Sequence, residues 1–219
     1  MARFPDIQQR IRDDILRGDL PFGTRITTAD LAQRYGVSQM PIREALRELR
    51  GEGLVTMEPN RGARVRSIDP EFVGNIFDIR NALEVLLVRR AARQRTPAQV
   101  LQMQEIETEL EACVAACDYP GALLANRRLH QLISAIAANP DAQVLLDRHW
   151  LLLAGLWRAH DFSPARYAGV INDHRHLIQA ISDGDGDTAA ILMHAHVLKA
   201  KQLLLQLVES RHARQTHTA

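Results

Sequence analysis

This chain of 219 residues has only two cysteines and no long apolar segment. Cys113 and Cys117 cannot build a disulfide framework, which favours reduced, partly buried thiols. No run of 18 apolar residues is present, and the N-terminus lacks the apolar core of a signal peptide. We therefore expect a cytoplasmic protein with no membrane partner. Hydrophobic residues make up 46% and charged residues 24%, as in an ordinary soluble protein.

Charge is also scarce, since the net value is +1, but it is unevenly distributed. Residues 1–68 hold 12 arginines, no lysine and 9 acidic residues, whereas the remainder holds 15 basic and 17 acidic residues. A surplus of three positive charges is modest, so nucleic-acid binding would need local clustering and two copies of the chain. A solvated arginine face remains an alternative for Arg10, Arg12 and Arg17.

The most informative segment runs from Gly36 to Leu46 and predicts a turn followed by a helix. Ser38 is a good N-cap, and Pro41 is tolerated in a first helical turn. Apolar residues then recur at i, i+3, i+4 and i+7, which predicts one buried face: Ile42, Ala45, Leu46 and Leu49. The residues left outward suit base edges and phosphates: Gln39, Met40, Arg43 and Arg47.

The neighbouring segments predict a winged helix-turn-helix. A first helix carries Ile7, Ile11 and Ile15, and a second begins with a capping pattern at Thr27 and Asp30. Two strand-like runs, 54–57 and 63–65, flank a basic turn at 59–62. The alternative is the end of a helical bundle beside a chance basic hairpin.

The rest of the chain is predicted to be an all-α bundle. Breaks that combine a capping residue with proline or glycine separate about six helices: 69–70, 96–97, 118–121, 139–140, 163–164 and 183–187. The fold class is therefore mainly α. We expect a DNA-binding domain at 1–68, a helical effector, metal and dimerisation domain at 69–210, and a flexible tail at 211–219.

Histidines are the chemical feature of this second domain. Helical periodicity places four polar side chains on apolar stripes: Asn126, His130, His174 and His196. His176 and His194 fall on other faces. Three imidazoles and a carbonyl oxygen from three helices suit a divalent metal, whereas the alternative is that each histidine is hydrogen-bonded separately.

Other readings of this domain stay open. A three-histidine site could activate water in a metalloenzyme with the winged helix as a docking module, but no inward Glu or Asp is evident as a general base. We therefore expect no enzyme. Arg80 could anchor the carboxylate of an effector or pair with Glu84 within its helix. Trp150 and Trp157 are expected in the core or a dimer interface.

Residues 5–66 closely resemble the DNA-binding domain of GntR-family transcription regulators. The resemblance is carried by separate pieces in the right order: 18–23, 31–32, 36–38, 41–46, Leu49, 52–55 and 61–65. It implies contacts to double-stranded operator DNA from Ser38, Gln39, Arg43, Arg61 and Gly62, with Met40 beside them. Relatives often carry Arg where this chain has Gln39, which predicts an altered operator preference because Gln suits adenine and Arg suits guanine.

Residues 69–208 resemble the FCD ligand-binding domain of the FadR-type branch. Arg80 with Glu84, 126–130, 139–140, 173–175 and 184–196 carry this match. It implies a homodimeric regulator, expected to be a repressor, with a small organic acid effector beside a metal, expected to be zinc or nickel. The matching ligands are Asn126, His130, His174 and His196. The family usually has Asp at Asn126, so metal binding is expected to be weaker.

Overall fold

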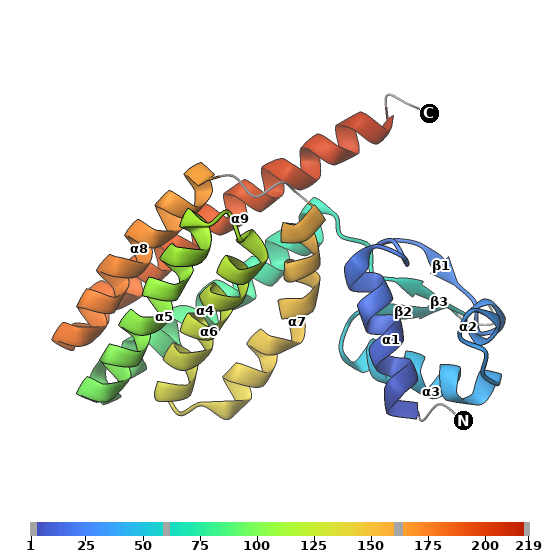
Figure 1. The fold of residues 1–219 in the computed structure, drawn as a ribbon, viewed down its shortest axis with the longest axis horizontal. Helices are drawn as coiled ribbons and strands as arrows, with labels where there is room; N and C mark the ends of the chain where they lie inside the picture. The colour runs from blue at the N-terminus through green and yellow to red at the C-terminus, as the bar shows by residue number, and fades with distance from the viewer. Residues whose placement is uncertain (1–3, 59–61, 160–163, 217–219) are drawn as a thin grey trace. The chain divides into compact units, whose positions relative to one another are not determined.

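The computed structural model describes residues 4–58, 62–159 and 164–216, and the chain divides into two compact units (Figure 1). The first unit comprises residues up to Phe72 together with Arg148–Leu156, and the second comprises Val73–Asp147 and the residues from Trp157 onward. This division lies four residues beyond the expected boundary and assigns the middle of one later helix to the first unit. The domain limits expected from the sequence stay a prediction.

The first unit is a winged helix-turn-helix with three helices and a small sheet. Its helices are α1 (Phe4–Arg17), α2 (Thr28–Tyr35) and α3 (Gln39–Gly51). Its strands are β1 (Arg25–Ile26), β2 (Val55–Glu58) and β3 (Gly62–Val65), in the antiparallel order β1-β3-β2. The sequence predicted β2 and β3 but not β1, because a two-residue strand is too short to show an alternating pattern.

Capping and burial explain why α2 and α3 form where they do. The Thr27 hydroxyl accepts the Asp30 N–H at 3.1 Å, and Gly36 ends α2 with a left-handed φ of 67°. The apolar face of α3 is fully buried, as predicted: Ile42, Ala45, Leu46 and Leu49. It packs on α1, whose buried residues include Ile7 and Ile11. Truncating one such side chain, as in Leu46→Ala, should cost about 2–5 kcal/mol.

Six helices follow the winged helix-turn-helix in the described residues, where about six were predicted. They are α4 (Pro70–Gln94), α5 (Pro97–Ala115), α6 (Tyr119–Ile136), α7 (Pro140–Ala159), α8 (Pro164–Asp183) and α9 (Gly186–Thr216). Among them, α5 packs on α6 and α8, and α8 packs on α9 (Figure 1).

The predicted breaks between these helices carry side-chain caps. Asp69, Thr96, Asp118, Asn139 and Asp185 each accept a backbone N–H three residues further on. Such caps satisfy donors that a helix start leaves unpaired, so short polar residues fix where each helix begins. The break predicted at 163–164 lies partly outside the described residues.

The flexible tail expected at 211–219 stays a prediction. Helix α9 continues through Thr216, past residue 211, and residues 217–219 lie outside the described residues. In the part of the chain that the structure describes, no helix is both long and apolar enough to cross a bilayer.

Candidate nucleic-acid interface and metal centre

The exposed face of α3 presents the side chains that the sequence predicted to read DNA. Ser38 precedes the helix with extended backbone (φ −70°, ψ 166°), and its side chain makes no capping hydrogen bond, so its hydroxyl remains open to a partner. Gln39, Met40 and Arg43 are exposed, and Met40 keeps 67% of its surface. The start of α3 therefore carries an amide, a thioether and a guanidinium outward.

A hollow of about 440 Å³ lies beside this face within the first unit. It is lined by residues of β1, the start of α2, α3 and the wing: Arg25, Thr27, Thr28, Arg43, Arg47, Met57, Glu58 and Gly62. Threonine hydroxyls and arginines in one concave surface are the groups that bind phosphate oxygens.

The arginines of this surface are not equivalent. Arg47 pairs with Glu44 at 2.9 Å, and Arg25 lies 3.7 Å from Glu58. Arg64 donates to Glu58 at 2.7 Å and to the Gly23 carbonyl at 2.8 Å.

Arg43 differs from these neighbours, because no acidic side chain among the described residues pairs with it. Its helical neighbours Glu44 and Glu48 do not pair with it, and Glu44 pairs with Arg47 instead. Its guanidinium remains available for a base or a phosphate.

Gly62 has a structural role at the wing. Its φ is +90°, and a Cβ there would lie 2.6 Å from the Ile26 carbonyl oxygen and 3.1 Å from the Thr27 Cα. Glycine is required because β1 crosses so closely. Arg61, predicted as the wing-tip contact, lies outside the described residues.

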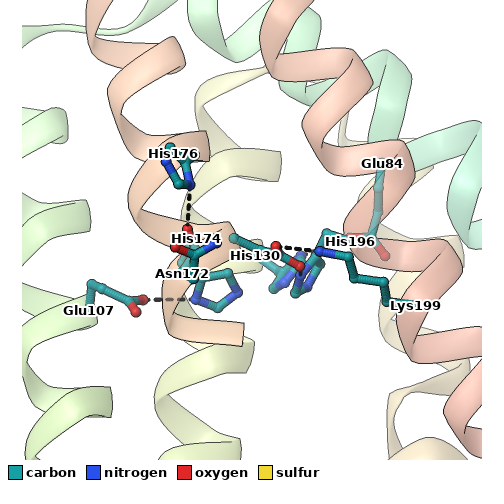
Figure 2. A network of polar contacts seen from close by, with 9 residues as sticks. Glu84, Glu107, His130, Asn172, His174, His176, His196 and Lys199 are labelled. Carbon is teal, nitrogen blue, oxygen red and sulfur yellow. Dashed lines mark hydrogen bonds and ion pairs between the residues drawn. The ribbon is translucent and has the colours of Figure 1, made fainter. Parts of the chain in front are cut away.

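Three imidazoles from three helices meet inside the second unit, as Figure 2 shows. His130 of α6, His174 of α8 and His196 of α9 each offer a nitrogen within 4.8 Å of the others. The ring centroids are 5.0–5.6 Å apart. His174 is fully buried and His196 is 8% exposed.

The two histidines that periodicity placed on other faces are exposed. His176 contacts the Asn172 carbonyl, and His194 contacts the Asn81 side chain.

Each ring of this three-histidine cluster is held by its own carboxylate. Glu84 Oε2 lies 2.7 Å from His130 Nδ1, and Glu107 Oε2 lies 2.8 Å from His174 Nδ1. Asp173 Oδ2 lies 3.5 Å from His196 Nδ1. The carboxylates of Glu84 and Asp173 have pKa values of about 2, so they are ionised and only accept. Nδ1 of His130 and of His196 therefore carries the proton, and Nε2 keeps its lone pair.

These carboxylates correct one expectation from the sequence. No inward acid was evident there, yet Glu84 is 3% and Glu107 is 4% exposed. Both were missed because each contact spans many residues: 46 between Glu84 and His130, and 67 between Glu107 and His174. Each of them contacts an imidazole through its Oε2.

The electrostatics keep the buried histidines neutral. Burial, together with nearby His130, lowers the pKa of His174 to about 3, and burial lowers that of His196 to about 4. Burial alone would raise the pKa of Glu84, but the positive charge of Arg80 and the His130 contact outweigh it and hold that pKa at about 2. Neutral imidazole is the form that binds a metal ion.

Glu107 and Asp173 are shifted in opposite directions. Burial and the charge of Glu111 raise the pKa of Glu107 to about 7. The contacts with His196 and Lys199 hold the pKa of Asp173 at about 2.

One atom of the cluster indicates that a ligand belongs there. His174 Nε2 is buried and has no hydrogen-bond partner among the described residues. A buried polar atom without a partner costs about 1–3 kcal/mol, and a cation would satisfy it. Carboxylate-backed histidines are also the usual arrangement around protein metal ions. The donor set therefore fits a divalent metal.

Asn126 lies half-buried on α6, one turn before His130. Whether it completes the cluster stays a prediction.

Arg80 pairs with Glu84, which is one of the two roles predicted for it, and its Nε still has a hydrogen to donate. Its Nη2 lies 2.6 Å from Glu84 Oε1, and its side chain is 16% exposed. Its Nε is buried, and no acceptor of the described residues reaches it. Both suggested roles, the ion pair and the anchor for an anion, are therefore compatible with the geometry.

Trp150 and Trp157 are buried, as expected for core residues.

Comparison with known families follows the same division of the chain. The profile described as bacterial regulatory proteins, gntR family, matches residues 5–65, and the FCD domain profile matches residues 75–199.

Relatives and solved structures cover most of the chain. The HTH-type transcriptional repressor RspR of Escherichia coli is 26% identical over 92% of this chain and 88% of its own length. The HTH-type transcriptional repressor GlaR of the same species is 34% identical over 48% of this chain and 50% of its own. The solved structure of E. coli McbR/YncC has a TM-score of 0.76 at 21% identity, covering 94% of this chain and 99% of that one.

Proposed function

Because the chain belongs to the GntR family of bacterial transcription regulators and carries an FCD domain, we propose that it is a repressor controlled by a small organic acid. The family is one of DNA-binding regulators and not of enzymes, so the metalloenzyme alternative is set aside. Two relatives, RspR and GlaR, are named as repressors, which supports the same direction of control here.

The main support for operator binding is that the Arg43 guanidinium is exposed and unpaired among the described residues. It is exposed beside the hollow of the first unit and has no acidic partner among the described residues. In our proposal Arg43 reads a base, Gln39 pairs with adenine, and Ser38 and Met40 flank them. Arg61 and Gly62 approach the DNA from the wing.

Two copies of the chain make this contact specific. A homodimer places its recognition helices about 34 Å apart, which matches successive major grooves of a palindromic operator. Since the first 68 residues carry a surplus of only three positive charges, doubling the interface also supplies the electrostatic strength that one copy lacks.

The metal centre consists of His130, His174 and His196, with Asn126 as the fourth ligand. Three imidazoles favour zinc or nickel, and the unpartnered His174 Nε2 is the observation that carries this assignment. When bound, the ion would supply positive charge beside the effector site. Asn126 lacks the charge of a carboxylate and holds a cation less tightly.

The effector is a small carboxylate, and Arg80 is its anchor. The buried Nε of Arg80 has no acceptor among the described residues, and a guanidinium can bind a carboxylate through two parallel hydrogen bonds. Occupancy of this site biases the helical domain, and in a dimer this changes how well the two recognition helices match the operator.

Selection of DNA from a random-sequence library tests the proposed function. The full chain should enrich a palindromic motif at moderate salt, and Arg43→Ala should weaken binding to that motif by about 1–3 kcal/mol. Failure to enrich any motif would overturn the assignment as a sequence-specific repressor.

A further inference from the structure

Glu84 touches both proposed ligand sites of the second unit. One oxygen, Oε1, lies 2.6 Å from Arg80 Nη2, and the other, Oε2, lies 2.7 Å from His130 Nδ1. The side chain is 3% exposed, so water does not screen either contact. A single carboxylate therefore divides its charge between the candidate anion anchor and a candidate metal ligand.

Glu107 offers a useful contrast within the same cluster. It holds His174 Nδ1 at 2.8 Å, as Glu84 holds His130. The arginine whose charge acts on it, Arg175, is bound to Glu111 instead. Figure 2 shows Glu84 and Glu107 on opposite sides of the three rings. Any effect specific to the arginine link should thus appear at Glu84 and not at Glu107.

We propose that Glu84 couples carboxylate binding at Arg80 to metal binding at His130, so that each ligand strengthens the other. This inference rests on the proposed metal and effector sites and adds the connection between them. Glu84 acts here as a positioning residue, since it reaches both ligands only through its neighbours.

The sign of the coupling follows from how one carboxylate shares its charge. A carboxylate ligand on Arg80 offsets the arginine charge, so Glu84 is drawn less to Arg80 and accepts more strongly from His130 Nδ1. The Nε2 of His130 then becomes a better electron-pair donor to a cation. Conversely, a cation on Nε2 makes the Nδ1 proton more acidic and draws Glu84 toward His130, which frees donors of Arg80. Linkage requires both effects to have the same size.

A direct bond between the effector and the metal is the competing explanation. It would also make the two ligands cooperative, but without any need for Glu84. The two explanations are separated by removing the charge of Glu84 while leaving the histidines and Arg80 in place.

Zinc affinity with and without acetate provides the test, measured by chelator competition at constant ionic strength with chloride as the reference anion. In the natural chain, acetate should tighten zinc binding by a factor in the range of about 5–150. Glu84→Gln and Glu107→Gln should each weaken zinc binding by about 10–100-fold, because each removes a carboxylate behind a ligand. Only Glu84→Gln should bring the acetate factor close to one.

The outcomes are distinct. An unchanged acetate factor in Glu84→Gln, or the absence of any factor in the natural chain, would overturn the coupling. Loss of the factor in both variants would show a general effect of weakened binding and would also overturn it. If Glu84→Gln does not fold, Glu84→Asp takes its place. Aspartate keeps the charge but is too short to reach both Arg80 and His130, so this variant should also bring the acetate factor close to one. Zinc retained by His174→Ala would instead show that the metal site itself is misassigned.

Discussion

Glu84 Oε2 and His130 Nδ1 lie 2.7 Å apart, on helices α4 and α6. This contact fixes the tautomer and the orientation of the imidazole, and it leaves the Nε2 lone pair for a cation. Glu107 likewise lies 2.8 Å from His174 Nδ1 and orients that ring. The second unit therefore preorganises its nitrogen ligands, which lowers the cost of binding a cation.

Removing the guanidinium of Arg43 should weaken operator binding more than removing that of Arg47. Both are exposed on α3, but Arg47 is already paired with Glu44 at 2.9 Å. Arg43→Ala should cost about 1–3 kcal/mol and relax specificity at one position, as measured by fluorescence anisotropy on operator variants. Arg47→Ala is the matched control, and an equal loss in both variants would contradict a base-reading role for Arg43.

Gln39→Arg should change the operator preference rather than the overall affinity. Glutamine pairs with adenine through its amide, whereas arginine pairs with guanine through two hydrogen bonds, each good pair being worth about 1–3 kcal/mol of discrimination. Parallel selections with the natural chain and the variant should differ at one symmetric pair of positions, from adenine to guanine. Identical motifs would exclude Gln39 from base contact.

Asn126→Asp should tighten zinc binding, because a carboxylate attracts a divalent cation more strongly than an amide does. We expect a gain of at least about tenfold, equivalent to about 1.4 kcal/mol, by isothermal titration. Asn75→Asp adds the same charge at an exposed position of α4 and should leave the affinity unchanged. Equal behaviour of the two variants would remove Asn126 from the ligand set.

Acid should destabilise the metal-free chain. The pKa values of His174 and His196 are about 3 and about 4 when folded, against an ordinary 6.5, so unfolding takes up two protons between about pH 6 and pH 4. Glu107 opposes this, since its pKa falls from about 7 to the ordinary 4.5 on unfolding and releases one proton.

Because the two protons taken up by the histidines outnumber the one released by Glu107, the free energy of unfolding falls as the pH drops from about 6 to about 4. Thermal unfolding in the presence of a chelator measures it, and His174→Gln should flatten the dependence. A natural chain that becomes more stable toward pH 4 would contradict the buried, neutral state of these rings.

Much of the fold could be predicted because its signals are local. Helix starts at Thr96 and Asp118 depend on caps within three residues, and the buried face of α3 follows from spacing alone. The inward position of His174 and the outward position of His176 follow from the helical repeat in the same way.

The carboxylates could not be predicted because their partners are distant in the sequence. Glu84 has the i,i+4 spacing of an ordinary ion pair with Arg80, and nothing near it points to His130. Glu107 stands in a run of acids on alternate residues, 105, 107, 109 and 111, which resembles a solvated surface. Residues two apart do not share a helical face, so this spacing shows that the four acids are not all on one face, but it does not show which of them is buried.

Equilibrium dialysis against zinc, followed by elemental analysis, tests the metal centre most directly. The natural chain should retain a single divalent ion per chain, and His174→Ala should lose it while His176→Ala, two residues away on the exposed face of α8, keeps it. A natural chain that retains no zinc, or a His174→Ala variant that retains as much as His176→Ala, would contradict a metal site built from His130, His174 and His196.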